Sequence, residues 1–139
     1  MNTRAPQGIL MSFVLFCIAL LLVITTAPFG FLYALVRQAC SSNAKSLNVY
    51  FVEVALVLDE VGNVTMQHLL NDILLIKNNE TYLFGNKSET ISSVIGKNSL
   101  THTLSPLGRT LNSFLNFLDK DHSLNSIIYD VKTWKDNWI

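Results

Sequence analysis

Hydrophobic residues are distributed in two ways along the chain, and the pattern changes near residue 40. Residues 9–36 read ILMSFVLFCIALLLVITTAPFGFLYALV and include no charged side chain. A helix rises about 1.5 Å per residue, so this run is long enough to cross a hydrocarbon core of about 30 Å. The pattern predicts a transmembrane helix over 9–36, preceded by a short N-terminal tail over 1–8.

The predicted transmembrane helix contains one proline that should disturb it. Pro28 lacks an amide donor and Gly30 loosens the backbone, so we expect a kink or a break near Pro28. Tyr33 and Arg37 carry aromatic and basic side chains, which suit a membrane interface. The residues expected to lie in the membrane anchor include Ile9, Leu20, Ile24, Pro28 and Val36.

A cleaved signal peptide is the competing interpretation of this run. Arg4 gives a basic start, and residues 25–27 (Thr-Thr-Ala) resemble a small-residue cleavage site. Two features oppose cleavage: Pro28 would follow the cut directly, and the apolar run continues to Val36, beyond a usual signal core. The retained anchor is therefore the preferred interpretation.

The remainder of the chain predicts a linker over 37–46 and a small domain over 47–139. From Leu47 onwards, polar residues recur at every fourth position, which is typical of an amphipathic helix. These residues are Asp59, Asn63, Gln67 and Asn71. Residues 49–58 are rich in β-branched side chains, so a strand is the alternative there. We prefer the helix because no turn signal divides residues 49–58 from the helical pattern that follows. A second membrane span over the same residues is not expected, since ten residues are too few to cross a bilayer.

The best-defined local signals lie near residue 105. Ser105 as N-cap and Pro106 at the first helical position predict a helix over 106–119. The side chains expected on one stripe of this helix are Leu107, Leu111, Phe114, Leu115 and Leu118. A last short helix is expected from Ser123 to about Tyr129. Trp134 and Trp138 then follow as possible anchors at a membrane interface or on a partner, with simple packing as the alternative. The expected fold class is all-α: one N-terminal transmembrane helix followed by a small helical domain.

Charge and composition exclude some kinds of function. Ten basic and ten acidic residues give a formal net charge of zero, and the basic residues are scattered, so no nucleic-acid partner is expected. Cys17 and Cys40 are expected to be free thiols. The three histidines are dispersed and no CxxC pair occurs, so neither a metal site nor a cofactor is expected.

One polar stretch, NKSETISSVIGK over 86–97, differs from the apolar sequence around it. Ser88 could cap a helix with its hydroxyl, which would place Glu89 and Thr90 in the first helical turn. Gly96 would then suit the end of that helix. On this interpretation the stretch is a helix with its caps.

The chain resembles a family of small, mostly uncharacterised bacteriophage and prophage proteins in three segments. These segments are ALVLDEVGN over 55–63, SETISSVIGK over 88–97 and LNFLDKDHS over 115–123. The family has Ala-Leu-Asp with Asn soon after, then Asp-Glu-Thr-Ile/Leu-Ser-Ser-Arg, then Asp-His-Cys. Here Val94 replaces the arginine, Ser123 replaces the cysteine, and a longer stretch precedes the first segment. The resemblance implies a phage origin but no reaction.

The polar residues shared with this pattern could be either catalytic or structural. An acid, hydroxyls and an imidazole are the parts that a hydrolase needs. The candidates are Glu89, Ser92, Ser93, Asp121 and His122. However, the sequence has no nucleophile elbow and no glycine-rich oxyanion loop. We therefore interpret Glu89, Thr90 and Ser93 as groups that bind backbone amides at a helix start, and His122 as a group that bonds the neighbouring turn.

These observations predict a non-enzymatic bacteriophage protein held in a viral internal membrane or the host inner membrane by one span. It would be a structural or accessory component of the virion or membrane. Its expected partners are the lipid bilayer and other phage proteins, such as capsid or membrane components. A lysis-related membrane protein is the alternative, although the span lacks the GxxxG pattern that favours close helix packing. A membrane-tethered hydrolase is a third possibility.

Overall fold

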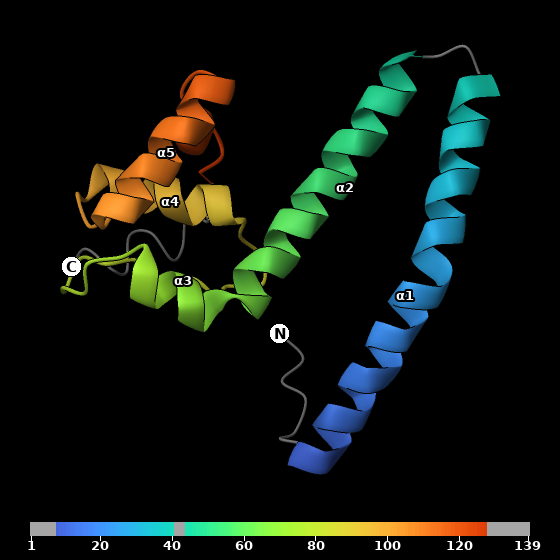
Figure 1. The fold of residues 1–139 in the computed structure, drawn as a ribbon, viewed down its shortest axis with the longest axis horizontal. Helices are drawn as coiled ribbons and strands as arrows, with labels where there is room; N and C mark the ends of the chain where they lie inside the picture. Colours follow the sequence, from blue (N-terminus) through green and yellow to red (C-terminus); the bar gives the residue numbers. More distant parts are fainter. Residues whose placement is uncertain (1–7, 41–43, 128–139) are drawn as a thin grey trace. The chain divides into compact units, whose positions relative to one another are not determined.

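The structure is a computed structural model that describes residues 8–40 and 44–127. Within these ranges the chain is helical and forms no strand, and a long apolar N-terminal helix is followed by smaller helices (Figure 1). The predicted fold class is therefore confirmed. The chain divides into two compact units, Met1–Phe51 and Val52–Ile139, which are described separately.

Helix α1, Ile9–Cys40, is the main element of the first unit. Its stretch Ile9–Gln38 is long and apolar enough to cross a membrane, a test that an N-terminal signal sequence would also pass. Helix α1 continues through Pro28, so the alternative of a break there is wrong, whereas the expected kink stays a prediction. The hydroxyls of Thr25 and Thr26 donate to carbonyl oxygens one turn earlier, each at 2.7 Å, so both are satisfied inside the helix.

Helix α2, Ala44–Thr65, confirms the helical interpretation of residues 49–58. Since α1 ends at Cys40 and α2 begins at Ala44, only residues 41–43 lie between them, fewer than the predicted linker over 37–46. The single helix expected beyond residue 65 is wrong, because Met66 interrupts it and a separate helix α3, Gln67–Ile73, follows. Asn63 and Asn71, on either side of this break, both hydrogen-bond to the backbone of the loop that follows α3.

The second unit is completed by α4, Ile91–Leu100, α5, Pro106–Leu118, and α6, His122–Asn125. The core of this unit is formed by α3, α4 and the segments that follow these two helices, and α5 packs against it through Leu111 and Leu115. Its buried members are Leu70, Leu74, Leu75, Phe84, Val94, Ile95 and Leu104. Figure 1 shows α4 and α5 side by side, and both also contact α6.

The boundaries of α5 agree with the local sequence signals. The Ser105 hydroxyl accepts a hydrogen bond from the Gly108 amide at 3.1 Å, and Pro106 occupies the first turn, both as predicted. Helix α6 ends at Asn125, earlier than the predicted end near Tyr129. Tyr129, Trp134 and Trp138 lie outside the described residues.

Gly96 does not end a helix, so that prediction is wrong. It lies in the middle of α4, where the backbone of α6 comes close: a Cβ atom at this position would overlap the Ser123 carbonyl oxygen and would lie 2.8 Å from an atom of Ile127. Glycine is therefore required by the close approach of two helices rather than by a turn.

We expect Gly96→Ala to lower the free energy of unfolding by about 1–3 kcal/mol, because a methyl group must displace backbone. Urea unfolding of the full chain in a non-ionic detergent, followed by circular dichroism, measures this loss. Gly62→Ala is the matched control, since its Cβ would meet only the flexible end of Ile91 at 3.0 Å. Equal midpoints for Gly96→Ala and the unaltered chain would contradict the packing argument.

Candidate functional site

The segment between α3 and α4, residues 74–90, has no helix and is held in place by asparagine side chains. Asn71 accepts a hydrogen bond from the Phe84 amide at 2.8 Å and donates one to the Phe84 carbonyl at 3.2 Å. Asn98 does the same for Tyr82, at 3.0 Å and 2.7 Å. Each side-chain amide therefore pairs with both backbone groups of one loop residue, as a neighbouring strand would.

A third asparagine, Asn63 of α2, is fully buried and binds three loop residues. Its Oδ1 accepts from the Gly85 amide at 3.0 Å, while its Nδ2 donates to the carbonyls of Asn86 at 2.9 Å and Glu89 at 2.7 Å. Both amide hydrogens and the carbonyl oxygen are used. Asn63 therefore fixes the last turn of the loop against α2.

The start of α4 is capped from two directions. Thr90 is its N-cap, and the Thr90 hydroxyl accepts from the Ser93 amide at 3.0 Å. From α2, the Asp59 carboxylate accepts from the Ile91 amide at 3.1 Å and from the Ser92 hydroxyl at 3.0 Å. A carboxylate at the positive end of a helix is favourable, and here it comes from a distant part of the chain.

The prediction that Ser88 caps this helix is therefore wrong. Ser88 and Glu89 precede α4, and the Ser88 amide donates to Asn86 at 3.2 Å. The cap shifted by two residues because Asp59 and Asn63 hold the chain before residue 91. The expectation that Thr90 binds a backbone amide at the helix start is confirmed, with Ser93 as the donor.

Glu89 forms a buried ion pair instead of binding backbone amides. Its side chain and that of Lys97 are 3% and 4% exposed, and the ammonium group contacts Oε1 of Glu89. The Tyr82 hydroxyl donates to the same oxygen at 2.9 Å, and the Lys97 nitrogen lies 4.2 Å from the Tyr82 ring centroid. Tyr82 thus contacts both charges, through a hydrogen bond and a cation–π contact.

The second oxygen of this carboxylate, Oε2 of Glu89, is buried and has no hydrogen-bond partner among the described residues. Burial of a charge with incomplete hydrogen bonding is costly in free energy. The contacts of Lys97 and Tyr82 with Oε1 must therefore offset the cost of burying the Glu89 carboxylate. The prediction that Glu89 binds backbone amides is wrong because its side chain is directed into the interior.

The remaining motif residues lie in and around α6. Asp121 adopts a left-handed conformation, with φ of 57°, immediately before this helix. The His122 ring nitrogen Nδ1 lies 3.1 Å from the Asp119 carboxylate, in agreement with the expected bond to the neighbouring turn. Ser123 is buried, and its hydroxyl donates to Asn112 at 2.5 Å.

The hydrogen bonds of Ser92 and Ser123 do not pair a hydroxyl nucleophile with the His122 imidazole. The hydroxyl of Ser92 donates to Asp59 and that of Ser123 to Asn112, so neither is directed at the His122 imidazole. Glu89 has Lys97 and Tyr82 as partners, whereas His122 has Asp119. A serine hydrolase needs a hydrogen bond between nucleophile and base, which these pairs do not provide. The groups described instead join segments of the chain.

Several residues of this network were not singled out from the sequence. Asp59, Asn63 and Asn71 belong to the four-residue polar repeat that predicts one face of a helix, and in the structure these side chains bind the loop and the start of α4. Asp59 and Asn63 also lie in the segment ALVLDEVGN that carries the resemblance. The occurrence of Asp59 and Asn63 both in the polar repeat and in this segment is the sequence signal that could have identified them as part of the network. Nothing in the sequence pointed to Tyr82 or Asn98.

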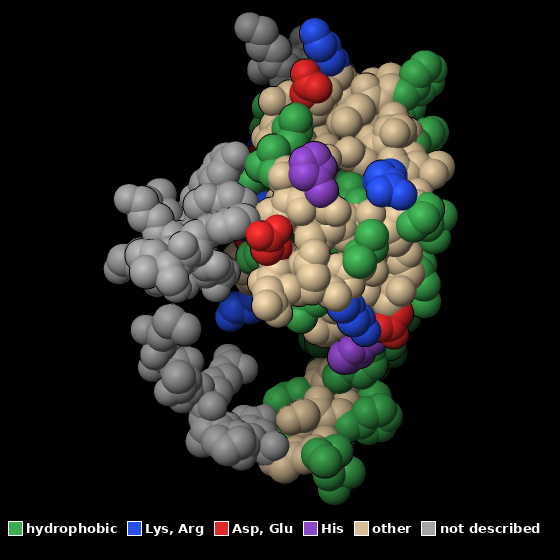
Figure 2. All heavy atoms as spheres, turned by 90° about the vertical axis from the view of Figure 1, so that its left-hand side faces the viewer, with side chains coloured by type: hydrophobic (Ala, Val, Ile, Leu, Met, Phe, Trp, Pro, Cys, Tyr) green, Lys and Arg blue, Asp and Glu red, His purple; other side chains and the backbone are tan. Residues whose placement is uncertain are grey.

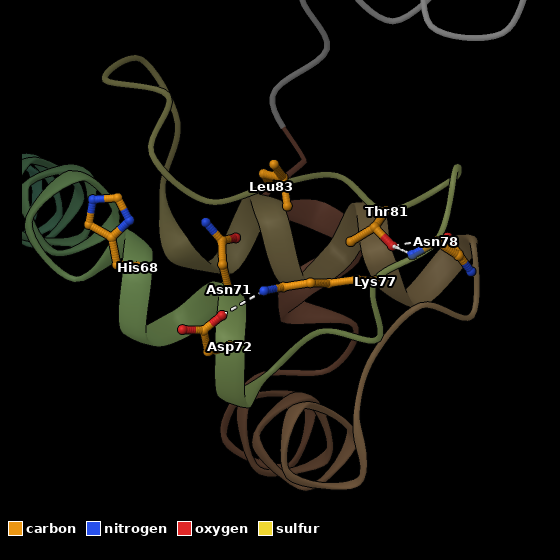
Figure 3. Close-up of a pocket in the computed structure, with 7 residues that line it drawn as sticks. All are labelled: His68, Asn71, Asp72, Lys77, Asn78, Thr81 and Leu83. Carbon is orange, nitrogen blue, oxygen red and sulfur yellow. Dashed lines mark hydrogen bonds and ion pairs between the residues drawn. The ribbon is translucent and has the colours of Figure 1, made fainter.

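A separate open pocket of about 400 Å³ lies beside α3 (Figure 3). Figure 3 shows Lys77 reaching across it to Asp72, with Nζ 2.7 Å from Oδ1, while Thr81 and Asn78 bond to each other at the far end. The hydrogen bond and charge of Lys77 lower the pKa of Asp72. Among the described residues no three His, Cys, Asp or Glu side chains are placed to hold a metal ion.

The surface of the second unit has a distinct apolar feature on α5. The exposed large side chains of this helix are Leu107, Phe114, Phe117 and Leu118. On the same helix, Leu111 and Leu115 pack against the core. In the view of Figure 2, charged side chains of both signs are interspersed, and the described residues on that face gather no patch of one sign.

Comparison with protein-family models, with curated proteins and with solved structures found no match to this chain. Any functional proposal therefore depends on the geometry described above and on the resemblance in the three sequence segments.

Proposed function

We propose that this chain is a non-enzymatic, membrane-anchored bacteriophage protein. It is a structural or accessory component of the virion or of a membrane, and its helical domain binds a protein partner. The observation that carries this proposal is that the polar motif is occupied by internal bonds. Asn63 and Glu89, which belong to the segments that resemble phage proteins, are buried and bind the fold itself.

The membrane part of the proposal is supported by α1. This helix is apolar over Ile9–Gln38, and none of the described side chains of that stretch is buried. A helix that is apolar on all sides needs either a protein core or a bilayer around it. A retained span would keep the helical domain at the membrane surface, where other membrane or capsid components are accessible.

The partner-binding part is supported by the exposed apolar residues of α5. Phe117 is 84% exposed and Leu118 is 65% exposed, although the same helix buries other residues in the core. Contiguous exposed apolar side chains on a helix are typical of protein contact surfaces, which bind an apolar groove through residues three and four apart. We therefore assign the contact surface to Leu107, Phe114, Phe117 and Leu118.

Photo-crosslinking in phage-producing cells tests this surface. With a photoreactive phenylalanine analogue in place of Phe117, we expect one defined adduct with another phage protein, because the side chain would lie in the interface. Glu80, exposed in the loop between α3 and α4 and not on α5, is the control position and should give little adduct. Equal adducts from both positions, or adducts with lipid alone, would refute a protein partner at this surface.

Retention of α1 is tested by intact mass. The mature protein in purified particles or membranes should begin at or beside Met1, and detergent should be needed to extract it. A mature product that begins at Pro28 would show that the segment is a signal peptide and would remove the anchor. Absence from both particles and membranes would refute the proposed location.

A further inference from the structure

A second cleft, of about 240 Å³, lies between the C-terminal end of α4 and one side of α5. Ser99 and His102 contribute from the α4 side, and Arg109, Asn112 and Ser113 from α5. The two walls are joined by a hydrogen bond from Asn112 Nδ2 to the Ser99 hydroxyl oxygen at 3.2 Å. Asn98 and Leu104 complete the lining, so the cleft borders the Glu89 network at Asn98, and none of its lining residues belongs to the apolar surface of α5.

The side chains that line this cleft are rich in hydrogen-bond donors. Arg109 offers five N–H groups in a planar fork, and His102 offers a ring N–H. Because Ser99 accepts a bond from Asn112, its own hydroxyl proton is available to another acceptor. None of the lining residues is Asp or Glu, and Arg109 forms no ion pair with a described acidic residue. The cleft therefore has positive charge and donors without an internal acceptor for them.

The α4 terminus itself does not compete for these donors. The carbonyl oxygens of Lys97 and Asn98 already accept bonds from the backbone and hydroxyls of Thr101 and Thr103. The His102 amide donates to the Ser99 carbonyl. His102 also has a positive φ of 57°, so its place at the cleft is set by an unusual backbone conformation. These carbonyl oxygens are thus already bonded within the chain.

We propose that this cleft binds a phosphate group. Arginine binds carboxylate and phosphate through two parallel hydrogen bonds, which does not distinguish the two anions. Donors on both walls of the cleft favour phosphate over carboxylate. An anion that bonds to both walls at once needs more than two acceptor oxygens, and a phosphate supplies three or four. The cleft has room for such a group but not for a large organic ligand. Free phosphate and the headgroup of a phospholipid share this chemistry. The inference does not depend on the proposed protein partner.

The test is a titration of the full chain, in a non-ionic detergent, with inorganic phosphate at constant ionic strength. Nuclear magnetic resonance should show saturable shifts at Ser99, His102, Arg109 and Ser113. Arg109→Ala should weaken binding about 10–100-fold, the factor expected for losing charge-assisted hydrogen bonds. Arg109→Lys keeps the charge without the planar fork and should give an intermediate loss.

Lys120→Ala is the matched control, because it removes one exposed positive charge elsewhere and should leave binding unchanged. In lipid nanodiscs without free phosphate, the same shifts in discs that contain phosphatidic acid, and their absence in pure phosphatidylcholine, would identify a headgroup as the source. Shifts only on addition of free phosphate would identify a soluble source. Linear shifts without saturation, or equal binding by Arg109→Ala, would overturn the proposal.

Discussion

Replacement of Glu89 by alanine should lower the free energy of unfolding by about 3–5 kcal/mol. The carboxylate is buried beside the Lys97 ammonium group, and it also accepts the Tyr82 hydroxyl. Without Glu89, the buried Lys97 loses its opposite charge and Tyr82 loses its acceptor, and water does not replace either partner. The loss should exceed the 0.5–2 kcal/mol that is typical of a helix cap. Urea unfolding of the full chain in detergent measures it.

Two further variants separate the ion pair from general damage. Glu80→Ala, in the exposed part of the same loop, should change stability by less than about 0.5 kcal/mol. The double variant Glu89→Leu/Lys97→Met should recover part of the loss, because it leaves no unpaired charge in the interior. Unfolding of Glu89→Ala at the same urea concentration as Glu80→Ala would contradict the buried pair.

The same variant distinguishes a structural motif from a catalytic one. If Glu89 acts through folding, biological activity should fall only as far as the folded population falls. A stable, well-folded Glu89→Ala protein without activity would instead indicate a chemical role, since loss of a catalytic group can leave stability unchanged or raise it. Phage yield measured together with the unfolding curve gives both quantities.

The elements that could be predicted are those whose signals are local. Ser105 and Pro106 lie next to the helix they start, so the sequence indicated α5 to within a residue. The apolar run of α1 needs no other part of the chain to be recognised. In contrast, the start of α4 depends on Asp59, which lies 32 residues before Ile91. The correct cap could not be chosen from Ser88 and Thr90 alone.

The candidate site was predicted as a set of residues but not as a network. A polar residue at every fourth position indicates one face of a helix, but it does not say whether water or another segment faces it. Here the loop after α3 faces it, and the side-chain amides take the place of a strand. The role of Gly96 was missed for the same reason, because α6 approaches it from a distant part of the chain.

Asn63→Ala should destabilise the second unit by about 2–5 kcal/mol. Two backbone groups depend on this side chain: the Gly85 amide and the Glu89 carbonyl, each of which would be left without its partner. Each unsatisfied buried group costs about 1–3 kcal/mol. Asn48→Ala, on an exposed position of the same helix, is the matched control and should be close to neutral.

Hydrogen exchange gives this prediction a local readout. Loss of the Asn63 oxygen should make the Gly85 amide exchange faster, together with its neighbours in the loop. Asn63→Asp tests whether the hydrogen bonds donated by the side chain are needed as well as the one it accepts. It keeps an acceptor for the Gly85 amide but places a negative oxygen against the Glu89 carbonyl. This variant should therefore be no more stable than Asn63→Ala. If Asn63→Ala left Gly85 exchange and stability unchanged, the loop would be held by other contacts, such as those of Asn71 and Asn98, and Asn63 would have no part in placing Glu89.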